Sequence, residues 1–146
     1  MAGTFTLRTV SPEGNVVSEE AEFVVLPGAE LGELGILPNH APLIAALDIG
    51  VIRYTKEDTI KRVAICGGFV EVENNIVTVL AETAELAENI DVERAKAALN
   101  RAEKRISEKA SGVDLSRAEM ARARAKARMI AVSMVSGFFK GKQEKH

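Results

Sequence analysis

Apolar and polar residues alternate along the first part of the chain, and this alternation stops near Ile90 and Asp91. Runs such as residues 4–10 and 69–73 place an apolar side chain at every second position, which is typical of strands with one buried face. Glycine, proline and asparagine separate these runs at short intervals. The pattern predicts a small β-sandwich or flattened barrel of about ten short strands over residues 1–87.

Three breaks in the alternation carry their own predictions. Residues 32–43 combine glycine and proline with apolar side chains, so we expect an ordered, partly buried loop or a broken strand there. Gly67 and Gly68 predict a bend between two strands. Asn74 and Asn75 predict a hairpin turn, because asparagine tolerates positive φ.

After Ile90 the apolar positions recur at spacings of three and four, which predicts two helices. Asp91 and Asp114 are candidate N-caps, because an aspartate carboxylate accepts the free amide protons of the first turn. Ser111 and Gly112 predict a turn between the helices. The apolar stripes comprise Val92, Ala95, Leu99, Ala102 and Ile106, then Leu115, Ala118, either Ala121 or Arg122, Ala125, Met129 and Val132. The sequence therefore predicts an antiparallel two-helix hairpin over residues 88–136 and a flexible tail over 137–146.

The helical part is rich in alanine. Alanine has the highest helix propensity, but each alanine buries little area, so the hairpin interface is weak beside a seam of leucine and isoleucine. Because the helices are expected to be locally stable but weakly docked, we predict a mobile hairpin with at least two arrangements.

The two parts differ in charge. Residues 1–85 contain 5 Lys/Arg and 13 Asp/Glu, whereas residues 86–146 contain 14 and 8. The acidic first part repels phosphate backbones and tryptophan is absent, which disfavours a nucleic-acid partner. No apolar run is long enough to span a bilayer, so we expect a protein without direct membrane insertion.

Candidate catalytic chemistry is sparse. A P-loop is absent, and one cysteine with two histidines makes a poor metal set. Cys66 lies in an expected strand and His40 in a proline-bounded loop, so neither predicts a nucleophile and its base. We therefore expect no catalytic residue and no metal.

The arginines of the expected hairpin offer a binding site. Arg94 and Arg101 lie two helical turns apart, and Arg124 and Arg128 one turn apart, so each pair shares a face. Folded together, the four guanidinium groups suit a nucleotide triphosphate. From their spacing alone, the interpretation of these arginines as solvent-exposed charges on amphipathic helices is favoured over a nucleotide site. Docking on an acidic protein surface is a third interpretation, because residues 117–128 hold five basic residues and one acid.

Three segments together resemble the epsilon subunit of F-type ATP synthases. They are residues 32–43 (GELGILPNHAPL), 67–72 (GGFVEV) and 77–84 (VTVLAETA). The two-helix tail with its aspartate-capped starts is similar as well, so the resemblance covers nearly the whole chain. It implies an N-terminal β-sandwich, a C-terminal helical hairpin and a non-catalytic rotor subunit, at the cytoplasmic face of the cell membrane, that couples proton or Na⁺ flow to ATP synthesis.

The resemblance also implies partners. The sandwich is expected to bind the gamma subunit and rest on the c-ring, through a contact loop of Glu30, Leu31, Glu33, Leu34 and His40. The hairpin is expected to extend toward the alpha and beta subunits and inhibit ATP hydrolysis. The inhibitory contacts to beta would be Arg117, Arg122, Arg124, Lys126 and Arg128.

Some bacterial members of the family bind ATP through a pattern Ile/Leu-Asp-x-x-Arg-Ala. Ile90, Asp91, Arg94 and Ala95 fit this pattern. The associated positions are Glu85, Arg101, Arg124 and Arg128. The resemblance therefore implies ATP as a regulatory ligand with no required cofactor. A free-standing ATP-binding sensor module is the alternative function, and a small enzyme is the least favoured one.

Overall fold

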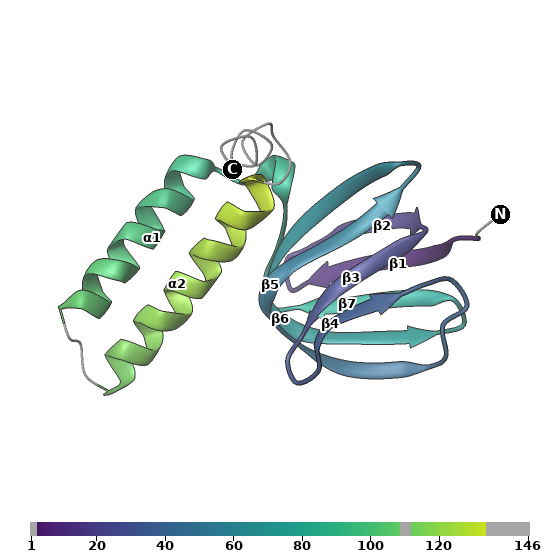
Figure 1. The fold of residues 1–146 in the computed structure, drawn as a ribbon, viewed down its shortest axis with the longest axis horizontal. Coiled ribbons are helices and arrows are strands. Elements are labelled where there is room, and N and C mark those ends of the chain that lie inside the picture. Colours follow the sequence, from purple (N-terminus) through teal and green to yellow (C-terminus); the bar gives the residue numbers. More distant parts are fainter. Residues whose placement is uncertain (1–2, 109–111, 134–146) are drawn as a thin grey trace, which may run out of the picture.

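The computed structural model describes residues 3–108 and 112–133. Within them, eight strands precede a short 3₁₀ helix and two α-helices (Figure 1). The strands are β1 (Phe5–Ser11), β2 (Gly14–Ala21), β3 (Phe23–Gly28), β4 (Gly32–Ile36), β5 (Leu43–Lys56), β6 (Thr59–Glu73), β7 (Ile76–Ala81) and β8 (Ala84–Leu86). The helices are η1 (Ala87–Asn89), α1 (Val92–Ser107) and α2 (Gly112–Ser133). The predicted order of a β-sandwich followed by a helical hairpin is confirmed; the predicted tail at 137–146 lies outside the described residues.

The strands form one hydrogen-bonded sheet in the order β2-β1-β7-β6-β5-β3-β4, with β8 added on β6. All pairs are antiparallel except β1 with β7. The long strands β5 and β6 pair from Leu43 with Val72 to Lys56 with Thr59. β6 pairs with β8 through its first half and with β7 through its second, so the sheet folds over into two layers (Figure 1).

The bend in this long pair lies at Gly67 and Gly68, whose φ angles are 81° and 131°. A Cβ atom on Gly68 would lie 2.0 Å from the carbonyl oxygen of Leu80, so glycine is required there. The predicted bend is therefore present, but it falls within one strand. Because β5 and β6 run through as single strands, the sandwich has eight strands and not about ten.

The segment of residues 32–43, predicted as an ordered loop or a broken strand, is a strand in its first part and irregular in the rest. Gly32–Ile36 forms β4 and pairs with β3, and β5 begins at Leu43. The hairpin turn predicted at Asn74 and Asn75 is present, with φ angles of 52° and 63°.

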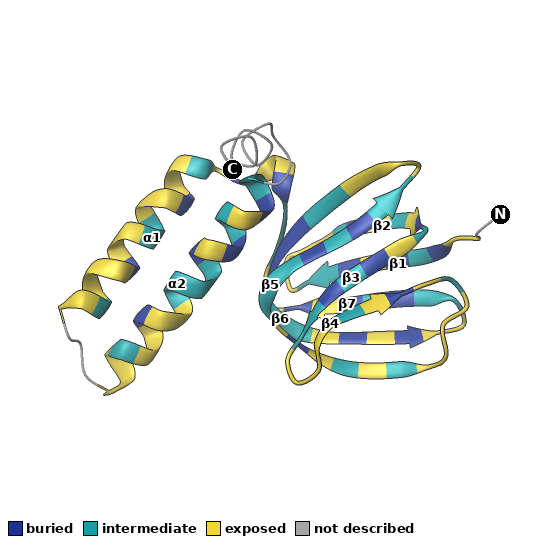
Figure 2. Cartoon of the chain, viewed as in Figure 1, coloured by how far each residue is buried: buried dark blue, intermediate teal, exposed yellow. Residues whose placement is uncertain are grey.

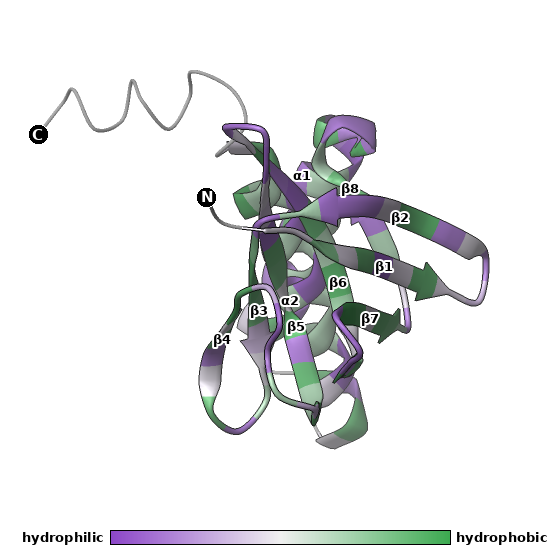
Figure 3. Cartoon of the chain, turned by 90° about the vertical axis from the view of Figure 1, so that its right-hand side faces the viewer, coloured by the Kyte–Doolittle hydropathy of each residue, from purple (hydrophilic) through white to green (hydrophobic). Residues whose placement is uncertain are grey.

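The core lies between the two layers. Alternating side chains of β1, β3, β5, β6 and β7 are buried there, including Phe5, Leu7, Leu26, Ile52 and Val63 (Figure 2). Figure 3 shows the same alternation as hydrophobic and hydrophilic segments along β1 and β2. The periodicity of two in the sequence is thus the periodicity of burial.

The first helix begins as predicted. The Asp91 carboxylate accepts the Arg94 amide proton at 3.2 Å and caps α1. The predicted N-cap at Asp114 is wrong, because α2 already begins at Gly112. Asp114 lies in the first turn, where its charge still complements the positive end of the helix dipole.

The second helix is buried on two sides, and the predicted stripe accounts for only part of this burial. Ala118 and Ala125 of the stripe are buried where α2 contacts α1. Ala127 and Ala131, which the stripe did not include, belong to a cluster with Ala64 of β6, and Met129 and Val132 of the stripe pack against the same cluster. α2 therefore lies between α1 and the sandwich (Figure 1). Five of the six buried residues in this cluster are alanines and the sixth is Ile90, with four larger apolar side chains partly buried around them. Alanines permit close approach of the helix and each buries little area.

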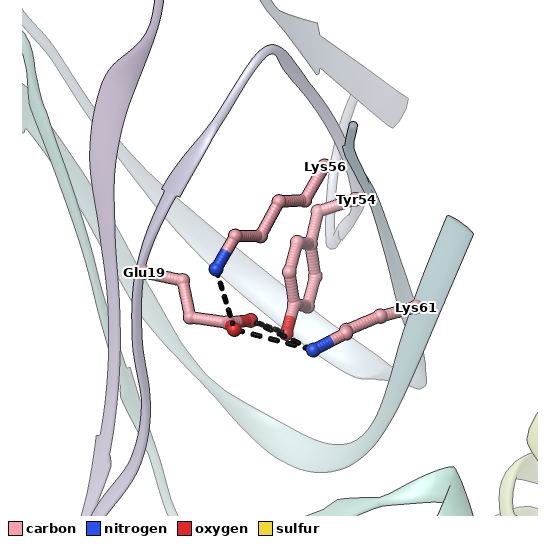
Figure 4. Close-up of polar contacts among 4 residues, drawn as sticks. All are labelled: Glu19, Tyr54, Lys56 and Lys61. Carbon is pink, nitrogen blue, oxygen red and sulfur yellow. Dashed lines mark hydrogen bonds and ion pairs between the residues drawn. The ribbon is translucent and has the colours of Figure 1, made fainter. Parts of the chain in front are cut away.

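A partly buried polar cluster of Glu19, Tyr54, Lys56 and Lys61 lies at the edge of the sandwich core (Figure 4). The Tyr54 hydroxyl donates a 2.5 Å hydrogen bond to Glu19, and the Lys56 and Lys61 ammonium groups lie 3.1 and 3.2 Å from the same carboxylate. The cluster joins β2 to β5 and β6. The hydrogen bond from Tyr54 is the main reason that the pKa of Glu19 falls to about 2. Burial is the main reason that the pKa of Tyr54 rises.

The Glu19 carboxylate predicts acid sensitivity. Its folded-state pKa lies below its ordinary value of 4.5, so its contribution to stability is present above that value and is lost as pH falls toward about 2. We expect Glu19→Gln to lower the free energy of unfolding at pH 6 and the difference from the unaltered protein to shrink on acidification. Urea unfolding at several pH values measures both. Tyr54→Phe should reproduce part of the loss, and a pH-independent difference would contradict this account.

Candidate functional site

A cavity of about 430 Å³ lies where the hairpin meets the sandwich. Glu85 of β8 and the residues that follow η1, Ile90 and Asp91, form one wall, α1 forms a second, and Arg128 of α2 closes the third side. The lining residues are Glu85, Ile90, Asp91, Arg94, Ala95, Ala97, Ala98, Arg101 and Arg128. Seven of the eight residues predicted to bind ATP therefore surround one cavity.

Local structure positions these residues. The chain leaves β8, makes the single turn of η1 and enters α1, so Glu85, Ile90 and Asp91 follow one another around the cavity. Ile90 and Ala95 are buried, with 8% and 1% of their surfaces exposed, and belong to the apolar cluster beneath α2. The Asp91 carboxylate caps α1 and thereby fixes where Arg94 and Arg101 project.

The cavity carries a positive charge excess. Arg128 Nε donates to Glu85 Oε1 at 2.7 Å, and both side chains are more than one-third exposed, so this pair stabilises docking by at most about 1 kcal/mol. Among the described residues, neither Arg94 nor Arg101 forms a salt bridge. Three guanidinium groups and two carboxylates, one of which caps a helix, therefore suit an anionic ligand.

Arg124 is placed differently from the other predicted arginines. It lies half-buried on α2, one turn before Arg128, and does not line the cavity. Three of the four arginines that sequence spacing brought together thus line the cavity, and Arg124 does not.

A second hollow of about 740 Å³ adjoins the first and shares Glu85, Arg94 and Arg128 with it. Its other lining residues come from the β1–β2 turn and from β8 and η1, and include Ser11, Glu13, Asn15, Thr83 and Asn89. Sequence reasoning missed these residues because the β1–β2 turn is far from the hairpin along the chain, and only the sheet order brings them together.

The predicted contact loop is divided by β4. Glu30 and Leu31 lie in the turn before β4, where Leu31 is 79% exposed. Glu33 pairs with Arg53 at 2.9 Å, and Leu34 packs against the core. His40 lies beyond the other end of β4, exposed, with Nδ1 2.7 Å from the carbonyl oxygen of Ala41.

The basic residues of α2 do not form a single face in this arrangement. Arg117, Arg124 and Arg128 follow one another at spacings of seven and four, so they share a face. Arg122 and Lys126 lie on another face. Arg117 and Lys126 are exposed, whereas Arg122, Arg124 and Arg128 are half-buried.

An apolar surface lies on the outside of the β5–β6–β7 region. Phe69 is paired with Ala46 on one side and Leu80 on the other, and Phe69 and Leu80 are 57% and 56% exposed. Ile44, two residues from Ala46 on the same strand face, is 73% exposed. We call Ile44, Ala46, Phe69 and Leu80 the outer apolar face. Sequence alternation identified these strands but not which face is left uncovered.

Two further features bear on the predictions. Across residues 3–108 and 112–133, no helix is long and apolar enough to cross a membrane. In the same residues, no cluster of three histidine, cysteine, aspartate or glutamate side chains is arranged to hold a metal ion.

Comparison with known proteins matches both parts of the chain. Residues 4–87 match the family described as ATP synthase, Delta/Epsilon chain, beta-sandwich domain, and residues 88–133 match its long alpha-helix domain. An ATP synthase epsilon chain of Desulfitobacterium hafniense is 64% identical over 109 residues, which is 75% of this chain and 82% of the relative. One of Syntrophomonas wolfei is 54% identical over 88% of this chain and 93% of the relative.

Solved structures share the fold. A chain in the Euglena gracilis mitochondrial ATP synthase superposes with a TM-score of 0.77 at 21% identity, covering 90% of this chain and 83% of that one.

Proposed function

The chain belongs to the Delta/Epsilon family of ATP synthase subunits, as a non-catalytic epsilon subunit of the central stalk, and we propose that its hairpin is an ATP-responsive switch. In the docked arrangement, the cavity between sandwich and hairpin holds ATP. In the released arrangement, the basic second helix reaches the alpha and beta subunits and inhibits ATP hydrolysis.

The cavity at the hairpin junction is the observation that carries this proposal. Arg94 and Arg101 of α1 and Arg128 of α2 line it together with Glu85 of β8. A triphosphate bound there contacts all three structural parts at once, and guanidinium groups bind phosphate oxygens in a planar fork. ATP is the regulatory ligand that this arrangement supports, and no cofactor is required.

The alanine contact supports reversible docking. Because Ala127 and Ala131 bury little area against Ala64, a ligand that binds only the docked form shifts the equilibrium by RT ln(1 + [L]/Kd). At a hundred times Kd this term is about 2.7 kcal/mol, larger than the Glu85–Arg128 pair supplies.

Release of the hairpin frees the basic residues of α2. Arg128 then loses Glu85, and Ala127 and Ala131 are exposed. A strongly basic helix with a small-residue face suits an acidic segment of a beta subunit. Arg117, Arg122, Arg124, Lys126 and Arg128 are the proposed contacts.

The outer apolar face supports a sandwich that remains bound to a partner. Exposed apolar groups of this kind mark protein interaction sites, which favours a docked subunit over a free-standing ATP sensor. We assign this face to the gamma subunit and the exposed β3–β4 turn, with Glu30 and Leu31, to the c-ring. In this position at the cytoplasmic face of the cell membrane, the sandwich helps couple proton or Na⁺ flow to ATP synthesis without entering the bilayer.

Calorimetric titration of the full chain with ATP tests the nucleotide site. We expect saturable heat of binding from the unaltered chain. Arg94→Ala or Arg128→Ala should each lower the ATP affinity more than tenfold, because a charge-assisted hydrogen bond contributes about 1.5–3 kcal/mol. Arg8→Ala, at an exposed arginine of β1, is the matched control and should bind like the unaltered chain. The absence of heat at millimolar ATP would contradict the proposal that this cavity binds ATP.

Removal of residues 91–146 tests inhibition. In the assembled complex we expect ATP hydrolysis to rise severalfold while the shortened subunit still co-purifies with gamma, because the sandwich has its own core. An unchanged hydrolysis rate in a complex that retains the shortened subunit would mean that the hairpin does not inhibit.

Serine substitutions on the outer apolar face test gamma binding. The double variant Ile44→Ser, Phe69→Ser should weaken gamma binding at least tenfold, because two exposed apolar side chains lose their burial in the interface. Ile60→Ser, at another exposed apolar position of the sandwich, is the matched control. Equal affinity of both variants for gamma would place the interface elsewhere.

A further inference from the structure

Two arginines lie directly opposite each other on the outer face of the sheet. Arg53 of β5 pairs in register with Arg62 of β6. The next pair on the same face is Val51 with Ala64, where α2 packs. Like charges at directly opposite positions of an antiparallel pair repel each other. Glu33 neutralises Arg53, because its Oε2 lies 2.9 Å from Arg53 Nη1, whereas Arg62 forms no salt bridge within residues 3–108 and 112–133.

The guanidinium group of Arg62 lacks a partner. The side chain is half-buried, and in the part of the chain that the structure describes its Nε atom is buried without a hydrogen-bond partner. A buried donor without a partner destabilises the folded state, and a charged one does so more strongly than a neutral one. Burial is the main reason that the pKa of Arg62 falls, and the like charge of Arg53 is the second. The free chain therefore carries an uncompensated positive charge that an anion would stabilise.

Neighbouring charges do not compensate Arg62. Lys61 points to the opposite face of β6, where its Nζ lies 3.2 Å from the Glu19 carboxylate (Figure 4). Glu88 of η1 lines the same hollow as Arg62, but it is exposed, and no ion pair joins the two among the described residues. The missing anion is therefore expected from outside the chain.

A hollow of about 160 Å³ lies beside Arg62, between the start of β6 and η1. Sites for small-molecule ligands commonly occupy about 300–1,000 Å³, so this hollow suits a single side chain of a partner protein. Its lining residues include apolar Ile60, Leu86 and Ala87 and charged Lys61, Arg62 and Glu88. An acidic side chain has the matching parts, because its stem is apolar and its carboxylate accepts hydrogen bonds from a guanidinium group.

The hollow lies at the end of the sandwich away from the β3–β4 turn. Leu86 of β8 lines it, and Figure 3 shows β8 at the upper end of the molecule and β4 at the lower end. The β3–β4 turn is the part assigned to the c-ring. The hairpin, which is proposed to reach the alpha and beta subunits, leaves the sandwich at the upper end, after η1. The hollow therefore faces the alpha and beta subunits, a placement that rests on the proposed function.

We propose that Arg62 and the hollow beside it bind an acidic side chain of an alpha or beta subunit. The carboxylate of the partner accepts a hydrogen bond from the Nε–H group of Arg62, and its stem lies against Leu86 and Ala87. The contact joins the sandwich directly to these subunits, at a place separate from the hairpin and from the outer apolar face. A charge that destabilises the free subunit thus gains its partner in the assembled complex.

The variant Arg62→Met separates this role from a structural one. Methionine keeps an unbranched stem but removes the charge and the unpaired donor. The free chain should unfold at the same temperature or a higher one in thermal scans, because no group in it loses a partner. In the assembled complex, the variant should dissociate about tenfold faster, because truncating one member of a buried charge pair raises the dissociation rate. Its affinity for isolated gamma should be unchanged. Arg8→Met, at an exposed arginine of β1, is the matched control and should dissociate like the unaltered chain.

Carbodiimide cross-linking of the assembled complex identifies the partner carboxylate. The reagent joins an amine to a carboxylate in contact with it, so the complex is built with Arg62→Lys. We expect an adduct between the substituted side chain and an aspartate or glutamate of an alpha or beta subunit, identified by mass spectrometry of the cross-linked peptides. Arg8→Lys should give no such adduct.

The outcomes decide the inference. A lower unfolding temperature of the free Arg62→Met chain would mean that Arg62 has a partner within its own chain, and would overturn the inference. An unchanged dissociation rate would do the same, as would an adduct only to Glu88 or Glu144 of the same chain. Equal losses of affinity for isolated gamma and for the complex would place the hollow in the gamma interface instead. If the unaltered chain does not join the complex, the proposed function itself fails, and the inference fails with it.

Discussion

The contact between α2 and the β5–β6 surface is the interaction on which the rest of the structure depends. Ala127 and Ala131 lie against Ala64, with Ile49 and Val51 beside them. Because these side chains are small, the helix approaches the sheet closely, but the area removed from water is limited. Without this contact α1 loses its support, the cavity loses its third wall and Arg128 is separated from Glu85. A site that exists only while a weak contact holds is suited to regulation, since a ligand of moderate affinity decides which arrangement dominates.

The sandwich is built for the opposite behaviour. Its apolar core is continuous across both layers, and the partly buried Glu19–Tyr54 hydrogen bond with two lysines joins β2 to β5 and β6 at the edge of that core. Among the described residues of the hairpin, the half-exposed Glu85–Arg128 pair is the one ion pair to the sandwich. The two modules therefore differ in the contacts that hold them, which are large apolar side chains within the sandwich and mainly alanines at the hairpin junction. The outer apolar face belongs to the sandwich, where a permanent partner is expected.

The cavity at the hairpin junction lies between these two modules. Its arginines come from the helices, whereas Glu85 comes from the sandwich and Asp91 caps α1. The acidic first part and the basic second part of the chain thus both contribute charged side chains to one cavity.

The sequence by itself determined the alternation of strands, the cap at Asp91 and the helical stripes, because these features depend on local spacing, which a chain displays before it folds. Most residues of the cavity were identified through the family resemblance at Ile90–Ala95 and not through spacing. Tertiary structure decided that β5 and β6 run through the bend at Gly67 and Gly68, because continuity of a strand depends on its neighbours. It decided that α2 buries a second face at Ala127 and Ala131. The sequence does not indicate this face, because alanine is common at both exposed and buried positions of a helix. It also left Arg124 out of the cavity lining and placed Asn15 in the neighbouring hollow, positions that depend on helix rotation and sheet order and that no local spacing encodes.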